Sequence, residues 1–189
     1  MNSPDARAPA ARFVLRPVEA ADLDAIQRIY AHHVLHGLAS FEEIPPDSAE
    51  LARRWRAIGD AGLPYLCATD AASGAILGYA YASAYRPRSA YRFTVEDSVY
   101  VAPEAAARGI GRALLQSLVE ICTKSGKRQM IAIIGDSGNA ASIGLHRACG
   151  FDLVGTFTAI GFKHGRWVDT VLMQRALGAG GEALPTEIA

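Results

Sequence analysis

The sequence lacks the features that would direct a protein to a charged or lipid surface. Its 189 residues carry 19 Lys and Arg against 19 Asp and Glu, so no net charge attracts a nucleic acid or an anionic membrane. Its longest apolar runs fall far short of the roughly 20 residues that span a bilayer. Residues 1–11 also lack the cationic segment and apolar stretch of a secretory signal. These absences predict a cytoplasmic protein without a nucleic-acid or membrane partner.

Cysteine is scarce as well. Cys67, Cys122 and Cys149 are an odd, widely spaced set without metal-like pairing. His32 and His36 lie one helical turn apart, but no Glu stands next to His32 and no third ligand is evident. We therefore expect small apolar cysteines in a reducing compartment, and no bound metal.

The length fits one domain, since domains commonly run to about 150 residues. The composition of both ends predicts a flexible N-terminus at 1–12 and a flexible Gly-rich tail at 178–189, leaving a single domain at 13–177. Hydrophobic periodicity predicts the order β α α β β β α β α β β within it, an α/β fold with helices on both faces of a mixed sheet. The expected strands are 13–16, 65–70, 76–85, 94–101, 130–134, 153–160 and 167–174.

Capping patterns predict where the first two helices begin and end. Asp22 precedes an apolar helical pattern that ends near Gly37, so we expect Asp22 to cap that helix. Asp47 and Glu50 form a capping-box-like pair at the start of the next helix, which Gly59 would close.

Two apolar patterns predict burial further along the chain. One helical face is continuous through Ile110, Ala113, Leu114, Ser117, Leu118, Ile121 and Cys122. The run 130–134 is wholly apolar, as in a strand that is buried on both faces.

A glycine loop lies between an expected strand and that helix, at Gly109-Ile-Gly111. Helix N-termini bind phosphate through free N–H groups, and glycines let the phosphate approach the backbone. A dinucleotide fingerprint anchored at Gly109 needs Gly or Ala where the chain has Leu114, and a P-loop needs Lys where it has Arg112, so both templates fail. A tight turn before a helix remains the alternative.

Several separated motifs, taken in order, resemble the GCN5-related N-acetyltransferases (GNAT). They are Ser98-Val-Tyr-Val101, the glycine loop with its helix, and Asn139-Ala-Ala-Ser-Ile-Gly-Leu-His146 followed by Gly150-Phe151. Further motifs resemble the phosphinothricin and methionine sulfoximine acetyltransferase branch: Ala39-Ser-Phe-Glu-Glu43, Tyr85-Arg-Pro-Arg88, Thr94-Val-Glu-Asp97 and Gly161-Phe-Lys-His-Gly-Arg-Trp167. The resemblance covers residues 13–175. It implies a mostly antiparallel seven-stranded sheet with splayed central strands, and a homodimer.

The resemblance also implies a site for acetyl-CoA, and no metal. The pantetheine arm would pair with backbone groups of Val99, Tyr100 and Val101, as a ligand adds to a strand edge. The remaining cofactor contacts would come from the loop and the next helix, at Ala107, Arg108, Gly109, Ile110, Gly111, Arg112, Asn139 and Ser142. Asn139 is equally expected as a helix cap. Ala106 departs from the usual Gln or Arg of the loop, and Arg108 or Arg112 could supply the missing charge.

Acetylating an amine requires removal of its proton, because free amines are largely protonated at pH 7. Glu96 lies in the middle of a strand whose alternation places it opposite to Asp97, and it is our candidate general base. Asp97 is the weaker candidate. His146 stands where the wider superfamily has a Tyr general acid, so it is a candidate acid or proton relay, or else a structural histidine.

The implied acceptor is a small amino-acid analogue, namely phosphinothricin, methionine sulfoximine or methionine sulfone. Arg86 and Arg88 would clamp its carboxylate, while Phe41, Tyr91, Glu96 and Ser98 would line its pocket. Transfer would be direct, because no cysteine falls at a motif position. Two alternatives remain: another amine such as an ordinary amino acid, a polyamine or a protein N-terminus, and a non-catalytic acyl-CoA-binding module.

Overall fold

The computed structural model describes residues 13–185. The N-terminus at 1–12 and the last residues, 186–189, lie outside the described residues. The first part of the expected tail, 178–185, forms turns beside the domain, and the Arg128 guanidinium donates a hydrogen bond of 3.0 Å to the Leu184 carbonyl.

The order of the elements is the expected one. The helices are α1 (Leu23–His36), α2 (Ser48–Asp60), α3 (Ile110–Lys124) and α4 (Ala140–Ala148). The strands are β1 (Phe13–Pro17), β2 (Tyr65–Asp70), β3 (Ile76–Ala84), β4 (Thr94–Val101), β5 (Gln129–Gly135), β6 (Asp152–Lys163) and β7 (Arg166–Ala176). The last two strands run longer than expected because they pair almost to the tip of their hairpin, where Lys163 faces Arg166.

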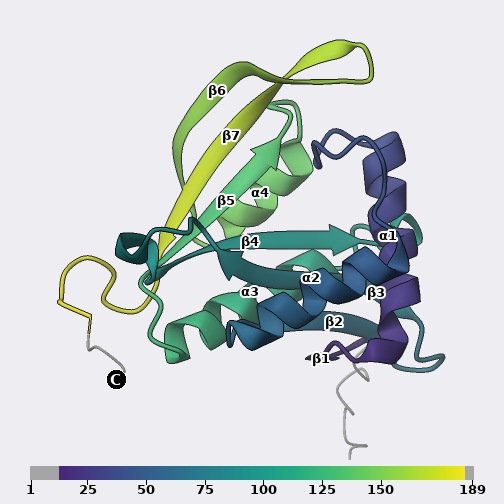
Figure 1. Ribbon diagram of the computed structural model, residues 1–189, viewed down its shortest axis with the longest axis horizontal. Coiled ribbons are helices and arrows are strands. Elements are labelled where there is room, and N and C mark those ends of the chain that lie inside the picture. The colour runs from purple at the N-terminus through teal and green to yellow at the C-terminus, as the bar shows by residue number, and fades with distance from the viewer. Residues whose placement is uncertain (1–12, 186–189) are drawn as a thin grey trace, which may run out of the picture.

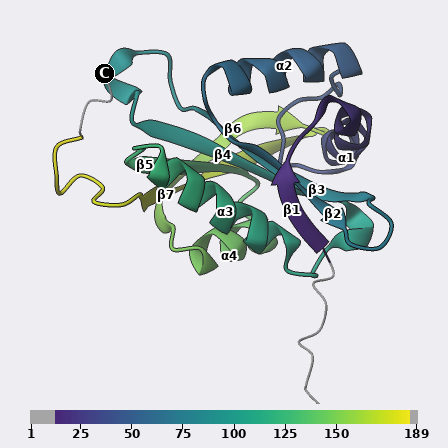
Figure 2. The ribbon, with the colours of Figure 1, turned by 90° about the horizontal axis from the view of Figure 1, so that it is seen from below.

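One seven-stranded sheet, in the order β1-β2-β3-β4-β5-β7-β6, forms the middle layer. Within residues 13–185, β4 and β5 form its one parallel pair, and the other neighbours are antiparallel. Helices α1 and α2 cover one face, and α3 and α4 cover the other (Figures 1 and 2). The fold is therefore the predicted α/β fold with helices on both faces of a mixed sheet, and the sheet is mostly antiparallel as the resemblance implied.

The caps of the first two helices differ in part from the prediction. Asp22 occupies the N-cap position of α1, but its side chain makes no capping hydrogen bond to that helix. Its carboxylate accepts instead from the Arg16 guanidinium at 2.6 and 2.8 Å and from the Glu19 N–H at 2.8 Å. Asp47 does cap α2, accepting from the Glu50 backbone N–H at 2.8 Å. The helix ends beyond Gly59, at Asp60.

Two predictions of burial need correction. Ile110, Leu114, Leu118 and Cys122 of α3 are buried as predicted, but Ile121 is 39% exposed. Leu115 and Val119 join the buried face in its place. Strand β5 is not buried on both faces, since Ile133 is 41% exposed. Ile133 is uncovered because β4 diverges from β5 before reaching it.

Candidate active site

The central feature of the site is an opening between β4 and β5. Their parallel pairing ends at Glu96 and Ile131, whereas β4 stays paired with β3 as far as Val101. The edge of β4 beyond Glu96 therefore has no strand beside it on that side. A cavity of about 840 Å³ opens there, and Val99, Tyr100 and Val101 line it. The splay that the resemblance implied is present, and residues of the unpaired β4 edge line the cavity where a pantetheine arm would pair.

The glycine loop forms the mouth of this cavity. Gly109 adopts a left-handed conformation with φ of 80°, which turns the chain into α3. Gly111 lets α4 approach, because a Cβ there would stand 3.3 Å from the Leu145 side chain. The first N–H groups of α3 have no partners within the helix, and its dipole favours an anion at this end. The residues present thus fit a pyrophosphate group.

The loop residues do not all contribute alike. Ala107, Gly109, Ile110, Gly111 and Arg112 line the cavity, as does the backbone around Ala106. Arg108 does not line it; its guanidinium lies 3.6 Å from the Asp70 carboxylate. Of the two arginines considered as a replacement for the missing loop side chain, Arg112 has the suitable position.

The start of α4 forms the opposite wall. The Asn139 side chain accepts a hydrogen bond of 3.1 Å from the Ser142 backbone N–H, and both residues line the cavity. Asn139 is therefore a helix cap, and its position leaves it available to a cofactor as well. On the α1 side, His33 Nε2 donates to the Val101 carbonyl at 2.9 Å, so that carbonyl is already engaged.

Glu96 stands where the opening begins. Its side chain is on the face of β4 covered by α1 and α2, half-buried, and beside the last β4–β5 pair. Burial and the neighbouring Asp97 raise the pKa of Glu96, and the charge of Arg86 opposes them. A carboxylate with a raised pKa is a stronger proton acceptor near neutral pH, which suits a general base.

Asp97 and His146 meet on the other face of β4. His146 Nε2 lies 3.0 Å from Asp97 Oδ2, and its Nδ1 donates to the Ser142 carbonyl at 2.8 Å. Both side chains are nearly fully buried, and Asp97 Oδ1 has no hydrogen-bond partner among residues 13–185. Burial lowers the pKa of His146, but the Asp97 hydrogen bond and charge outweigh it and raise the pKa overall.

A second, small cavity of about 50 Å³ links these groups to the large one. It is lined by Asp97, Ser98 and His146 together with Asn139 and Ser142, the last two of which also line the large cavity. The structure thus brings the expected cofactor contacts other than Arg108 into two neighbouring cavities, the smaller of which His146 also lines.

The expected acceptor residues lie on the α1–α2 side. Arg86 stacks on the Tyr85 ring at 5.2 Å, and the Tyr85 and Tyr91 rings are 5.6 Å apart. Arg88 is exposed at the turn Ser89–Tyr91. Arg86 is near enough to Glu96 to influence its pKa. Arg88 contacts Tyr91 through the backbone, because its carbonyl accepts a hydrogen bond of 2.9 Å from the Tyr91 N–H.

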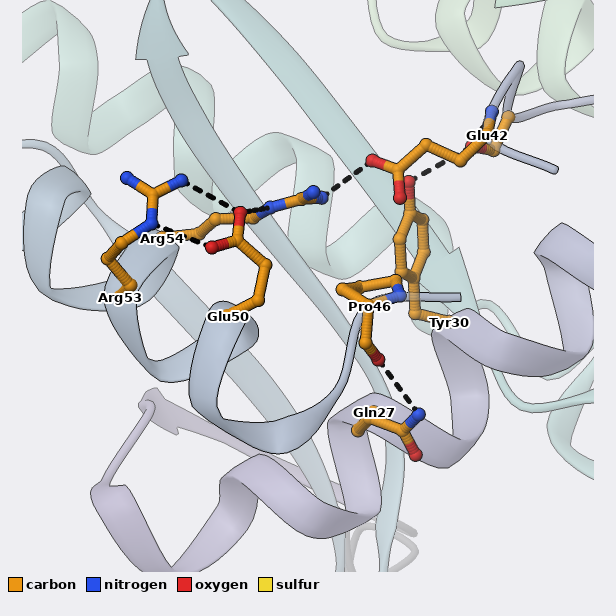
Figure 3. Close-up of polar contacts among 8 residues, drawn as sticks. Gln27, Tyr30, Glu42, Pro46, Glu50, Arg53 and Arg54 are labelled. Atoms are coloured by element: carbon orange, nitrogen blue, oxygen red, sulfur yellow. Dashed lines mark hydrogen bonds and ion pairs between the residues drawn. The ribbon is translucent and has the colours of Figure 1, made fainter. Parts of the chain in front are cut away.

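Phe41 belongs to the loop between α1 and α2, which several contacts fix. A Cβ at Gly161 would overlap the Phe41 ring, so the ring lies directly on β6. The Ser40 hydroxyl is 3.0 Å from that of Tyr30, and Gln27 donates to the Pro46 carbonyl at 3.1 Å (Figure 3).

Sequence reasoning missed the buried Lys163, whose Nζ donates to the Ser40 carbonyl at 2.6 Å. It also missed that Asp97 pairs with His146. The alternation of β4 placed Asp97 on the opposite face of the sheet from Glu96, where a buried carboxylate needs a hydrogen-bonding partner. No local signal could identify that partner 49 residues away.

Comparison with known families agrees with this geometry. The family described as "Acetyltransferase (GNAT) domain" matches residues 15–172. In the part of the chain that the structure describes, a sheet opened at β4–β5 and a glycine-turned helix start form one cavity. The chain therefore belongs to the GNAT family of acetyltransferases.

The relatives narrow the assignment. The phosphinothricin N-acetyltransferase of Alcaligenes faecalis is 58% identical over 171 residues, 90% of this chain and 86% of that one. An L-methionine sulfoximine/L-methionine sulfone acetyltransferase of Pseudomonas aeruginosa is 42% identical over 160 residues, 85% of this chain and 92% of that one. A crystal structure of a phosphinothricin acetyltransferase from Sinorhizobium meliloti, in complex with AcCoA, superposes with a TM-score of 0.91 at 54% identity, covering 94% of this chain and 95% of that one. The protein is an acetyl-CoA-dependent N-acetyltransferase of the phosphinothricin and methionine sulfoximine branch.

Proposed function

We propose that this enzyme acetylates the amino group of phosphinothricin, methionine sulfoximine or methionine sulfone. The relatives at 58% and 42% identity, which carry these substrates in their names, support the proposal. The observation that carries it is the half-buried Glu96 carboxylate, with its raised pKa, where the β4–β5 opening begins.

Acetyl-CoA supplies the activated acetyl group and a thiolate leaving group. In the proposed mechanism Glu96 removes a proton from the acceptor ammonium, directly or through water. A backbone N–H on the unpaired edge of β4 would polarise the acetyl carbonyl. The free N–H groups at the start of α3 would bind the pyrophosphate. His146 is the proposed proton donor; the Ser142 hydroxyl, 3.4 Å from its Nδ1, leads toward the cavity. Arg86 and Arg88 are proposed to hold the acceptor carboxylate.

A thiol-release assay over a panel of amines tests the substrate proposal. Phosphinothricin, methionine sulfoximine and methionine sulfone should release CoA faster than ordinary amino acids, polyamines or an N-terminal peptide. Faster CoA release with a polyamine or a peptide than with the three analogues would contradict the proposal. No release above background with any amine would favour a non-catalytic binding module.

Glu96→Gln tests the assigned base. We expect kcat to fall by about 10²–10⁴-fold, since the variant cannot accept a proton. Acetyl-CoA affinity measured by calorimetry should stay unchanged, and the exposed Glu120→Gln on α3 serves as the control. A variant with near wild-type turnover would refute the role of Glu96.

The proposal includes a homodimer in the cytoplasm. The β6–β7 hairpin exposes more than half of Leu153, Val154, Phe157, Phe162 and Trp167, an apolar surface that a second copy of this chain would cover. The three cysteines are free and buried, which suits a reducing compartment. Light scattering should give twice the chain mass, and Phe162→Glu should give the monomer; a monomeric wild type would contradict this part.

A further inference from the structure

A cavity between α2 and the sheet has no part in the mechanism described above. Its volume is about 280 Å³, below the roughly 300–1,000 Å³ of clefts that hold drug-sized ligands. Four tyrosines, Tyr30, Tyr65, Tyr79 and Tyr81, contribute to its lining, and α2 adds residues that include the exposed Ala57. A cavity of this size and character suits one side chain rather than a whole cofactor.

The cavity and Glu96 share one face of the sheet. Ser83, which lines the cavity, is the cross-strand neighbour of Glu96, and Tyr81 is the neighbour of Ser98. Residues directly opposite on paired strands have Cβ atoms about 4.5–5.5 Å apart. An acceptor whose amino group reaches Glu96 therefore has this cavity beside it.

The charges around the cavity are matched. Arg54 lines it and donates to Glu42 at 2.6 Å and to Glu50 at 2.8 Å (Figure 3). Arg53, also in the lining, binds Glu50 at 2.7 Å. Burial raises the pKa of Tyr65 and Tyr81, so their hydroxyls stay neutral. The walls thus offer aromatic rings, hydroxyl groups and guanidinium groups that already have carboxylate partners.

Glu42 joins the cavity to the rest of the acceptor side. It follows Phe41 in the loop between α1 and α2, and its backbone N–H donates to the Ser40 hydroxyl at 3.2 Å. Glu42, Arg54 and Glu96 all lie close enough to Tyr81 to influence its pKa. The negative charge of Glu42 therefore lies close to two lining residues of the cavity, Arg54 and Tyr81.

We propose that this cavity is the subsite for the acceptor's side chain, and that Glu42 makes it select uncharged side chains by neutralising Arg54. An uncharged side chain, such as a thioether, sulfone, sulfoximine or aromatic group, can contact the rings and hydroxyls there without breaking an ion pair. The anionic phosphinate of phosphinothricin has to compete with Glu42 for Arg54. The inference rests on the proposed function and adds a preference for methionine sulfone over phosphinothricin.

Glu42→Gln tests the role of charge. The side chains of Arg54 and Glu42 are 38% and 35% exposed, so the variant should fold. We expect the ratio of kcat/KM for phosphinothricin to that for methionine sulfone to rise about fivefold, the factor that corresponds to about 1 kcal/mol. The change should lie in KM, and Glu120→Gln, which also removes one exposed carboxylate, should leave the ratio unchanged.

Ala57→Leu tests the role of space. The larger side chain narrows the cavity from α2, so KM for methionine sulfone should rise while KM for acetyl-CoA stays the same. Calorimetric titration of methionine sulfone into the CoA-bound protein should show the same loss of affinity. Gly59→Ala is the matched control, because it also enlarges a residue of α2 but has nothing within 4 Å of the new Cβ.

The outcomes separate this inference from the proposed function. A wild type active on both analogues, with selectivity unchanged by Glu42→Gln and affinity unchanged by Ala57→Leu, would overturn the inference alone. A wild type that releases no CoA with either analogue would overturn the proposed function and the inference with it.

Discussion

Replacing Asp97 with asparagine should make the stability of the enzyme less dependent on pH. Both ring nitrogens of His146 face acceptors, the Ser142 carbonyl and the Asp97 carboxylate. An imidazole can satisfy two acceptors only when both nitrogens carry protons, so the folded protein favours the charged form. This is why the pKa of His146 is raised in spite of burial.

The direction of the pH effect follows from that raised pKa. A histidine that binds its proton more tightly when folded stabilises the protein fully below its unfolded value of about 6.5. The stabilisation is lost as pH rises through the folded pKa. In Asp97→Asn the amide N–H can donate to an unprotonated Nε2, so His146 no longer needs the second proton. The dependence of the free energy of unfolding on pH that His146 causes therefore disappears.

The magnitude comes from the change in hydrogen-bond type. A hydrogen bond to a charged group contributes about 1.5–3 kcal/mol and a neutral one about 0.5–1.5 kcal/mol, so the variant should lose about 1–1.5 kcal/mol at pH 6. For a domain of this size that corresponds to a fall in Tm of about 2–6 °C. The difference should shrink toward pH 9.

Urea unfolding at pH 6, 7, 8 and 9, followed by tryptophan fluorescence, measures the free energy of unfolding of both proteins. His146→Gln in each background separates the pair from each residue alone. A loss in Asp97→Asn that stays constant from pH 6 to pH 9 would refute the shared-proton account, as would no loss at pH 6.

Three further variants test other parts of the site. Arg86→Gln removes the charge that opposes the raised pKa of Glu96, so the acidic limb of the kcat/KM profile should move to higher pH, and an unmoved limb would contradict this. Gly161→Ala should displace the Phe41 ring, with about 1–3 kcal/mol lost in urea unfolding and a raised KM for the acceptor; unchanged values would show that the ring adapts. Asn139→Ala should cost about 1 kcal/mol as a lost helix cap and also weaken acetyl-CoA binding in calorimetry, whereas a stability loss alone would leave Asn139 purely structural.

The sequence predicted the features that depend on local pattern. The order of strands and helices was confirmed, and the alternation of β4 correctly placed Glu96 and Asp97 on opposite faces. Asp47 was correctly expected as the cap of α2. Each of these follows from residues only a few positions apart.

The sequence could not predict features that depend on distant partners. Asp22 does stand at the N-cap position of α1, but its carboxylate binds Arg16 of β1 and the Glu19 N–H rather than the helix. Strand β5 looked buried on both faces, but the divergence of β4 uncovers Ile133. The roles assigned to Glu96, His146 and the arginines stay predictions until the variants above are measured.

The short β4–β5 ladder has a mechanical consequence. Three residue pairs, from Thr94–Gln129 to Glu96–Ile131, join β1–β4 to β5–β7 across the sheet. The two parts of the sheet, β1–β4 and β5–β7, are therefore hydrogen-bonded to each other only at one end of β4 and β5. A ligand bound between β4 and β5 contacts both strands and restrains their separation. Its binding should therefore slow amide exchange throughout β4 and β5 and not only at the residues that it contacts. The gap that admits the cofactor would then also be the place where the empty enzyme opens first.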